Sequence, residues 1–368
     1  MPNIKYIDDK IEIFLDKVDS IEDEKMFAMS ILYMNNGDIQ ENRKYAWSSS
    51  EEEKSVWTNR YNLFSGIVEN VRVLEEDQII LDEKINFEGK NVVVEFHSRN
   101  LGDTIALMHV MNRFKSDNNC NMFLNPHNKE WDSFLFEITD DIKNITSISK
   151  DQIDYSQKFS FKFGETRTRE MSLYENYQDF LNVNEPLKIT IKEIPDIEEN
   201  IPKPYICFSE FASNSNKEWK YEGGWQQVID HFTDSGYTMV NISKEESNLT
   251  NCLNLTGEDR DLMHRLGTIK DSEFCIFLDT GLSWVANLID KHCFLIKSVY
   301  SDKFSFQDHQ TPISLNSDSY CRGCWDNNNY FWDSVTKECF TRKDFECSRL
   351  ITPEMVINTI ETKLTEGI

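Results

Sequence analysis

The chain has 368 residues and a formal net charge of −25, which leaves no broad basic surface for DNA or RNA. Its length is sufficient for two or three domains. No apolar run approaches the ~20 residues that cross a bilayer, and residues 1–6 do not resemble a secretory signal. We therefore expect a cytoplasmic protein without a membrane span, whose nine cysteines are reduced thiols or metal ligands.

Residues 1–88 are expected to form a β-rich accessory domain. Between Ile4 and Phe87, apolar residues alternate or come in short runs, and Asn36-Gly37 and Gly66 lie between these runs as turn signals. This stretch contains no catalytic signature. We expect it to act as a scaffold or to contact other subunits.

Residues 89–194 have the pattern with which a doubly wound α/β domain begins. A continuous apolar strand at 91–96 leads through a turn with Gly102 into a helical segment that continues to Phe114. Asp103 follows the carboxyl end of that strand, where such domains bind ligands. Two interpretations of Asp103 have equal support here: a carboxylate that faces the ligand, or an N-cap of the following helix.

A second α/β domain is predicted over residues 203–318, after a linker at 194–204 that has three prolines among acidic residues. Strands are expected at 205–208, 238–242, 274–278 and 293–296, and helices at 225–235, 260–266 and 282–289. Two such halves around a linker predict a two-domain enzyme that binds its ligand between them.

Two loops of the second domain have features of phosphate-binding loops. Residues 213–225 combine small polar side chains with Lys217 and Lys220, and residues 279–284 turn from a strand into a helix through Gly281. Free N–H groups at a helix start can approach a phosphate closely. Both segments are also compatible with ordinary surface loops, because many α/β loops share this geometry without a ligand.

Four cysteines, Cys321, Cys324, Cys339 and Cys347, follow the spacing C-x2-C-x14-C-x7-C within residues 319–349. A C-x2-C knuckle with two further thiols suits a tetrahedral metal site, and four protein ligands make such a site structural. Zinc or iron is the expected ion. Ordinary buried thiols or two disulfides are the alternative. The last segment, residues 350–368, is expected to form a helix that packs back on the first α/β domain.

The chain carries an ordered set of motifs from about Val92 onward. They are Leu101-Gly102-Asp103-Thr104-Ile105-Ala106, Lys217-Glu218-Trp219 with Gly224-Trp225, Ile242-Ser243-Lys244-Glu245, Gly281-Leu282-Ser283-Trp284, the four cysteines and Ile351-Thr352-Pro353-Glu354-Met355-Val356. In this set the chain resembles the bacterial autotransporter heptosyltransferases, relatives of the lipopolysaccharide heptosyltransferases that use ADP-heptose. The cysteine-rich tail is its most specific part, since the lipopolysaccharide enzymes lack it.

The resemblance implies an α/β fold of the GT-B glycosyltransferase type, with two Rossmann-like domains, the N-terminal β-rich domain and a C-terminal metal finger built on the four cysteines. It implies transfer of heptose from ADP-heptose to serines of an autotransporter adhesin, iron in the finger with zinc as the alternative, and a homo-oligomer in the form of a large ring. Asp103 would be the general base of an inverting reaction, and Lys217 would stabilise the leaving diphosphate. The donor-binding residues would be Gly102, Thr104, Lys220, Lys244, Glu245, Thr280, Gly281, Leu282, Ser283 and Trp284.

No catalytic metal is expected, because no Asp-x-Asp motif is positioned to bind Mg²⁺. The chain departs from the family pattern at Trp284, where the lipopolysaccharide enzymes carry His, in a short final cysteine spacing, and in its first 90 residues. A glycosyltransferase with a different nucleotide sugar or a glycan acceptor is therefore the alternative function. A non-catalytic metal-binding scaffold is the second alternative.

Overall fold

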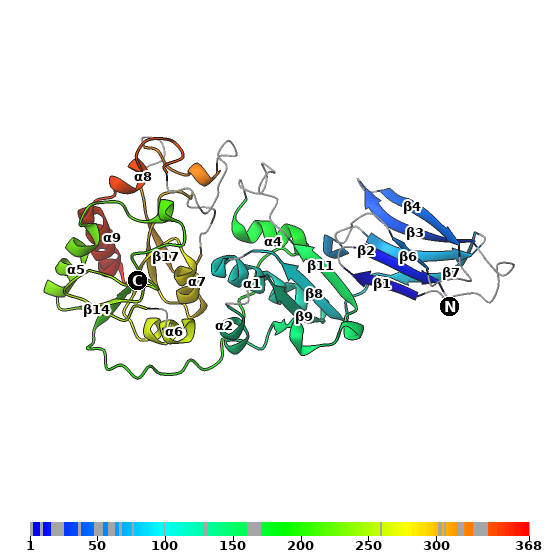
Figure 1. Cartoon of the computed structure of the whole chain (residues 1–368), viewed down its shortest axis with the longest axis horizontal. Helices are drawn as coiled ribbons and strands as arrows, with labels where there is room; N and C mark the ends of the chain where they lie inside the picture. Colours follow the sequence, from blue (N-terminus) through cyan, green and yellow to red (C-terminus); the bar gives the residue numbers. More distant parts are fainter. Residues whose placement is uncertain are drawn as a thin grey trace.

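The computed structural model describes residues 3–7, 10–15, 26–35, 38–47, 54–57, 63–65, 68–75, 77–98, 100–127, 131–159, 171–257, 260–300, 304, 307–315, 320–326 and 338–367. These residues form three sheets (Figure 1). The N-terminal strands lie at one end of the molecule. The α/β unit of residues 89–194, here the first half, lies in the middle, and the α/β unit that follows the linker, here the second half, lies at the other end.

The N-terminal region is β-rich, as predicted. Its antiparallel sheet has the order β4 (Asp38–Trp47), β3 (Met26–Asn35), β6 (Val68–Glu75) and β7 (Gln78–Lys84). The strands β1 (Asn3–Ile7), β2 (Lys10–Leu15) and β5 (Lys54–Trp57) belong instead to the sheet of the first half, which β1 joins by pairing with β11 in parallel. The predicted boundary at residue 88 therefore falls between parts that share one sheet.

The first half has a largely parallel sheet with the order β10 (Lys143–Asn144), β9 (Asn121–Pro126), β8 (Asn91–Phe96), β11 (Tyr155–Phe159), then β1, β2 and β5. Its helices are α1 (Leu101–Asn118), α2 (Asp132–Glu137) and α4 (Leu173–Leu181). Strand β8 forms because Val92, Val93 and Val94 are buried on both faces of the sheet, which is typical of a central parallel strand.

The second half has an all-parallel sheet with the order β14 (Leu253–Asn254), β13 (Thr238–Asn241), β12 (Tyr205–Phe208), β15 (Cys275–Leu278), β16 (Cys293–Ile296) and β17 (Gln310–Ile313). Counted within this half, the order is 3-2-1-4-5-6, that of dinucleotide-binding sheets. Its helices are α5 (Gly224–Asp234), α6 (Leu262–Lys270) and α7 (Gly281–Leu288). Strands β14 and β17 were not predicted.

The C-terminal helix corrects one prediction. Helix α9 (Pro353–Glu366) was expected to pack on the first half, but it packs on α5 and β17 of the second half (Figure 1). Val356 and Ile360 of its apolar face are fully buried in the core of the second half. The Trp219 indole donates to the Ile351 carbonyl at 2.8 Å, which anchors the chain just before α9 to that half.

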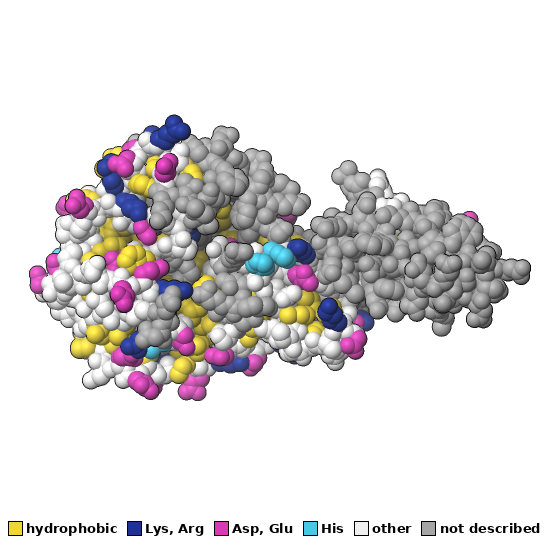
Figure 2. Space-filling view, in the orientation of Figure 1, with side chains coloured by type: hydrophobic (Ala, Val, Ile, Leu, Met, Phe, Trp, Pro, Cys, Tyr) yellow, Lys and Arg dark blue, Asp and Glu magenta, His cyan; other side chains and the backbone are white. Residues whose placement is uncertain are grey.

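None of the helices in the described ranges is both long and apolar enough to cross a membrane. On the face drawn in Figure 2, acidic and basic side chains of the described α/β residues are interspersed. Positive charge must therefore be sought in local pockets rather than across this face.

Candidate active site

A cavity of about 610 Å³ lies between the two halves. Its walls come from the start of α1, from α2, and from the loops that follow β12, β13 and β15. In open α/β sheets, ligands bind at the carboxyl ends of the strands, which is where these loops lie. The candidate residues that line the cavity are Gly102, Asp103, Lys217, Lys244, Glu245, Thr280, Gly281, Leu282 and Trp284.

Asp103 is the third residue of α1 and does not cap it, since Asn100 occupies the N-cap position. Its carboxylate accepts hydrogen bonds from Ser98 Oγ at 2.5 Å and from Asn100 Nδ2 at 3.0 Å. Burial raises the pKa of the Asp103 carboxyl, although these two donors and the Lys217 ammonium act in the opposite direction. A carboxyl with a raised pKa that is held in one orientation has the properties of a general base.

Lys217 ends a short 3-10 helix (Ser215–Lys217) in the second half. Its ammonium donates to the backbone oxygen of Asp279 at 3.3 Å and lies 4.7 Å from the centre of the Tyr300 ring. Burial alone would lower the pKa of Lys217, but Tyr300, Asp279 and Asp103 outweigh it and the pKa is raised. Lys217 therefore stays charged at neutral pH and can bind an anion in the cavity.

Two glycines allow the halves to meet at the cavity. A Cβ on Gly102 would lie 2.5 Å from Cδ1 of the Trp284 indole, and a Cβ on Gly281 would lie 3.1 Å from Cβ of Leu101. The first distance is far shorter than a van der Waals contact, so only glycine fits under Trp284. The start of α1 thereby lies directly against the start of α7, which brings Asp103 close to the Thr280 loop.

Thr280 is the N-cap of α7, and its Oγ1 is buried without a hydrogen-bond partner among the described residues. A buried hydroxyl without a partner costs free energy, so a ligand atom would satisfy it. Gly281 and Leu282 follow it in the cavity wall. Lys244 and Glu245 are found at another part of the lining.

Three of the predicted donor-binding residues do not line the cavity. Thr104 Oγ1 donates to the Asn100 carbonyl, and Ser283 Oγ donates to the Thr280 carbonyl, so both hydroxyls stabilise helix starts. Lys220 pairs with Glu218 at 2.6 Å and lies over the Phe345 ring. The structure thus engages these side chains elsewhere.

The structure adds Asp279, Tyr300, Arg260 and Arg265 to the lining. The Asp279 carboxylate lies 3.6 Å from Lys297 Nζ, and both side chains are largely buried. Arg265 is buried and donates to the carbonyls of Ile242 and Gly257, so it holds the loop after β13. A buried arginine within an amphipathic helix was a signal that the sequence offered. Tyr300, after β16, has no local motif.

The four predicted metal ligands lie near one another in the described part of the tail. The Thr341 hydroxyl is 3.1 Å from Cys321 Sγ and 3.3 Å from Cys339 Sγ. Burial, reinforced by the neighbouring cysteines, raises the pKa of the Cys324 and Cys347 thiols to about 12.

Four gathered thiols are a donor set that fits zinc or iron. However, within the described ranges no group of three or more His, Cys, Asp or Glu residues has the spacing of a metal site. The chemistry of the cluster therefore fits an ion, whereas the sulfurs of these described residues do not form a ligand shell.

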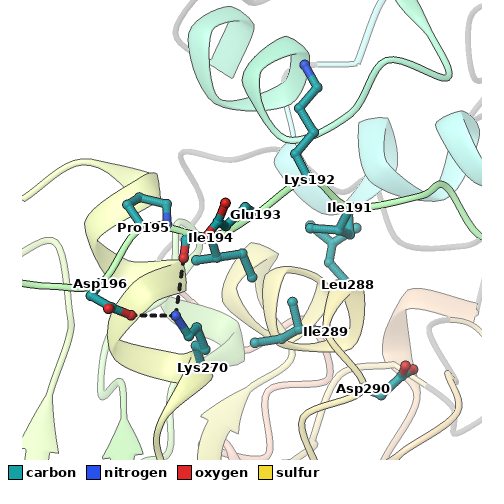
Figure 3. Close-up of a pocket in the computed structure, with 10 residues that line it drawn as sticks. All are labelled: Ile191, Lys192, Glu193, Ile194, Pro195, Asp196, Lys270, Leu288, Ile289 and Asp290. Carbon is teal, nitrogen blue, oxygen red and sulfur yellow. Dashed lines mark hydrogen bonds and ion pairs between the residues drawn. The ribbon is translucent and has the colours of Figure 1, made fainter.

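A second cavity, of about 790 Å³, lies beside the linker (Figure 3). It is lined by Ile191, Lys192, Glu193, Ile194, Pro195, Asp196, Lys270, Leu288, Ile289 and Asp290. Lys270 donates to the Ile194 carbonyl and to Asp196, so its charge already holds the linker against α6. The larger cavity thus lies at the linker, and the candidate catalytic side chains lie in the smaller one.

No model of a protein family matches the chain. The chain is 26% identical to the autotransporter heptosyltransferase Aah of Escherichia coli over 317 residues, which are 78% of each chain. It is 23% identical over 182 residues to the inactive autotransporter heptosyltransferase BimC of Burkholderia thailandensis, over 46% of this chain and 42% of BimC.

Among solved structures, the chain is similar to the iron-containing dodecameric glycosyltransferase TibC of enterotoxigenic E. coli. The TM-score is 0.76 at 19% identity, over 99% of this chain and 96% of TibC. TibC has also been crystallised with ADP-D-beta-D-heptose, and that structure gives a TM-score of 0.75 at the same identity and coverage.

The fold is thus a mixed α/β fold shared with known glycosyltransferases. Within that class, the chain is similar in sequence to the autotransporter heptosyltransferases, which confirms the resemblance predicted from its motifs.

Proposed function

We propose that this protein transfers heptose from ADP-heptose to serine hydroxyls of an autotransporter adhesin, as an inverting glycosyltransferase of the GT-B type. One observation carries the proposal: Asp103 of the first half and Lys217 of the second half face one cavity, and their charges interact across it. The reaction needs a base for the acceptor and a cation for the leaving group. The activity named for Aah and the ADP-heptose bound to TibC support the choice of donor.

In the proposed reaction, the serine oxygen attacks the anomeric carbon while the bond from that carbon to the diphosphate oxygen breaks. The Asp103 carboxylate accepts the serine proton, and ADP leaves with the electron pair of the broken bond. Lys217, the Thr280 hydroxyl and the N–H groups at the start of α7 line the cavity and would stabilise the charge on the diphosphate. The raised pKa of Asp103 makes it a stronger base than an exposed aspartate.

We further propose that Cys321, Cys324, Cys339 and Cys347 hold iron, with zinc as the alternative. The four thiols gathered around Thr341 support this assignment, as does the iron named for TibC. A closed thiolate site would stabilise the finger and leave no open position for chemistry. A homo-oligomer is proposed by analogy with dodecameric TibC, and a cytoplasmic location stays a prediction.

The function is tested by incubating the purified protein with ADP-heptose and a fragment of a candidate adhesin. Asp103→Asn should lower kcat by about 10²- to 10⁴-fold, because the proton acceptor is lost. Lys217→Met should lower it by about 10²-fold, because the leaving diphosphate loses its cation. No transfer by the wild type, or full transfer by Asp103→Asn, would sink the proposal.

Matched controls are available for both substitutions. Asp117→Asn changes an aspartate of the same helix whose side chain is about half exposed and pairs with Arg113 at 3.6 Å. Lys203→Met changes an exposed lysine that pairs with Asp271 at 3.2 Å. Neither residue lines the cavity, so both variants should keep wild-type activity.

The second candidate is a non-catalytic scaffold, which is favoured by the similarity to the inactive BimC. A scaffold would show no turnover with any acceptor, and Asp103→Asn would then change no measurable activity. A thermal-shift screen over nucleotides and nucleotide sugars separates the remaining alternative, a different donor, since a true donor raises the melting temperature by mass action.

A further inference from the structure

Tyr300 touches the candidate catalytic lysine directly, although no motif marks it. Its ring lies 4.7 Å from Lys217 Nζ, and the two side chains share a hydrogen bond. Only 8% of Tyr300 is exposed, and it lines the cavity between the two halves. Tyr300 is therefore in position to determine where the Lys217 ammonium lies.

The hydrogen bonds of Lys217 give this contact a direction. An ammonium has three N–H donors. One donates to the backbone oxygen of Asp279, and a second to the Tyr300 hydroxyl. With two donors held by the protein, the third is directed by the geometry of the first two, and it is left for a ligand in the cavity.

Tyr300 is in turn held by the cysteine knuckle, residues 321–325. Gly323 N donates to the Ser298 carbonyl at 3.2 Å, and Trp325 N donates to the Val299 carbonyl at 3.0 Å, so the knuckle binds the backbone just before Tyr300. The Trp325 ring also contacts the Tyr300 ring edge-on, with 5.4 Å between centroids. Tyr300 thus lies between the knuckle and Lys217.

The same tail holds the Lys217 loop from its other side. Ser348, next to Cys347 in α8 (Glu346–Arg349), donates through Oγ to the Glu218 carbonyl at 2.7 Å and accepts from Lys220 N at 2.9 Å. Both contacts fall within three residues of Lys217. The cysteine-rich tail is therefore attached to the Lys217 loop and to Tyr300 at once.

We propose that Tyr300 is a positioning residue of the donor site, held by the cysteine knuckle so that the Lys217 ammonium directs one N–H toward the donor diphosphate. This inference rests on the proposed function, because it takes a nucleoside diphosphate sugar as the ligand. It gives the tail a role in the transfer without a residue that touches the reacting atoms.

The test compares the binding of ADP and of adenosine by isothermal titration calorimetry. Tyr300→Phe keeps the ring and its contact with Trp325 and removes only the hydroxyl. It should weaken ADP binding about tenfold, the effect of one lost hydrogen bond to a charged group, and leave adenosine binding unchanged. Equal ADP affinity in wild type and Tyr300→Phe overturns the inference, as does an equal loss for both ligands, because a packing role alone would not discriminate between them.

Three further variants sharpen the result. In a Lys217→Met background, Tyr300→Phe should cause no additional loss, whereas an additive loss shows that the two residues act independently and contradicts the inference. Trp325→Leu should weaken ADP selectively, and unchanged ADP binding would refute the anchoring by the knuckle. Tyr237→Phe, a ring packed between Phe232 and Phe274 away from the cavity, should bind both ligands normally.

The outcomes also separate this inference from the proposed function. A wild-type protein that binds neither ADP nor adenosine refutes the proposed donor, and the inference with it. A wild type that binds ADP, together with an equally tight Tyr300→Phe, refutes the inference alone.

Discussion

Gly102→Ala is the sharpest perturbation of the contact between the two halves. Gly102 lies in the first turn of α1 and has no positive φ, so alanine in its place would by itself favour the helix by roughly 0.5–1 kcal/mol. The added Cβ, however, would lie 2.5 Å from Cδ1 and 2.8 Å from Nε1 of Trp284. Only 3% of Trp284 is exposed, and its ring packs edge-on against Tyr174, so it has little room to yield.

Relief of this overlap requires a shift of about 1 Å, either of the indole or of α1 relative to α7, to reach an ordinary contact of roughly 3.5–4 Å. Overpacking of this kind costs about 1–3 kcal/mol. A misplacement of about 1 Å between catalytic groups can cost about 10²-fold in rate. We therefore expect Gly102→Ala to lower the free energy of unfolding by about 1–3 kcal/mol in urea titrations and to lower kcat by up to about 10²-fold in the transfer assay.

Two comparisons identify the clash as the cause. Gly281→Ala meets Leu101 at 3.1 Å, a milder overlap, and should cost less in both assays. Trp284→Ala should restore part of the lost stability when combined with Gly102→Ala, since the cost of the added methyl depends on the indole. A Gly102→Ala protein as stable and active as the wild type would refute the reasoning.

Three further predictions follow from the same contacts. Ser98→Ala removes a donor that lowers the pKa of Asp103, so the pKa should rise further and the acid limb of kcat/KM against pH should move to higher pH, and an unmoved limb contradicts the assignment. Cys321→Ser should lose the bound metal in elemental analysis, whereas Cys252→Ser, outside the cluster, should retain it. Ile360→Ala should cost about 2–5 kcal/mol of stability in urea unfolding, because this fully buried side chain of α9 fills the core of the second half.

Most of the α/β architecture could be predicted because each strand has its own local signal. Buried parallel strands appear as short apolar runs, and β8, β12, β13, β15 and β16 begin and end within a residue of their expected bounds. Strand β17 was missed because Gln310-Thr311-Pro312-Ile313 is only partly buried and contains a proline, which is typical of an edge strand. The side on which α9 packs was also beyond the sequence, since its apolar face fits either half.

The candidate site divides in the same way. Asp103 and Lys217 lie in loops beside a recognisable strand or helix start, so their sequence position alone indicated a cavity-facing role. Tyr300 depends on contacts with Lys217 and with a knuckle that begins more than twenty residues later in the chain. Periodicity and spacing do not encode such contacts. Thr104 and Ser283 show the opposite error, because a small hydroxyl residue at a helix start can serve a ligand or the helix itself.

The charge arrangement explains how a protein with a net charge of −25 could bind an anionic donor. The Asp279 carboxylate lies against Lys297, at 3.6 Å between largely buried atoms, while Lys217 contacts the backbone carbonyl of Asp279. Among the described residues, no carboxylate lies within ion-pair distance of Lys217, so no protein partner there neutralises its charge. A diphosphate entering the cavity would then meet a cation that two neutral acceptors, the Asp279 carbonyl and the Tyr300 hydroxyl, orient without neutralising.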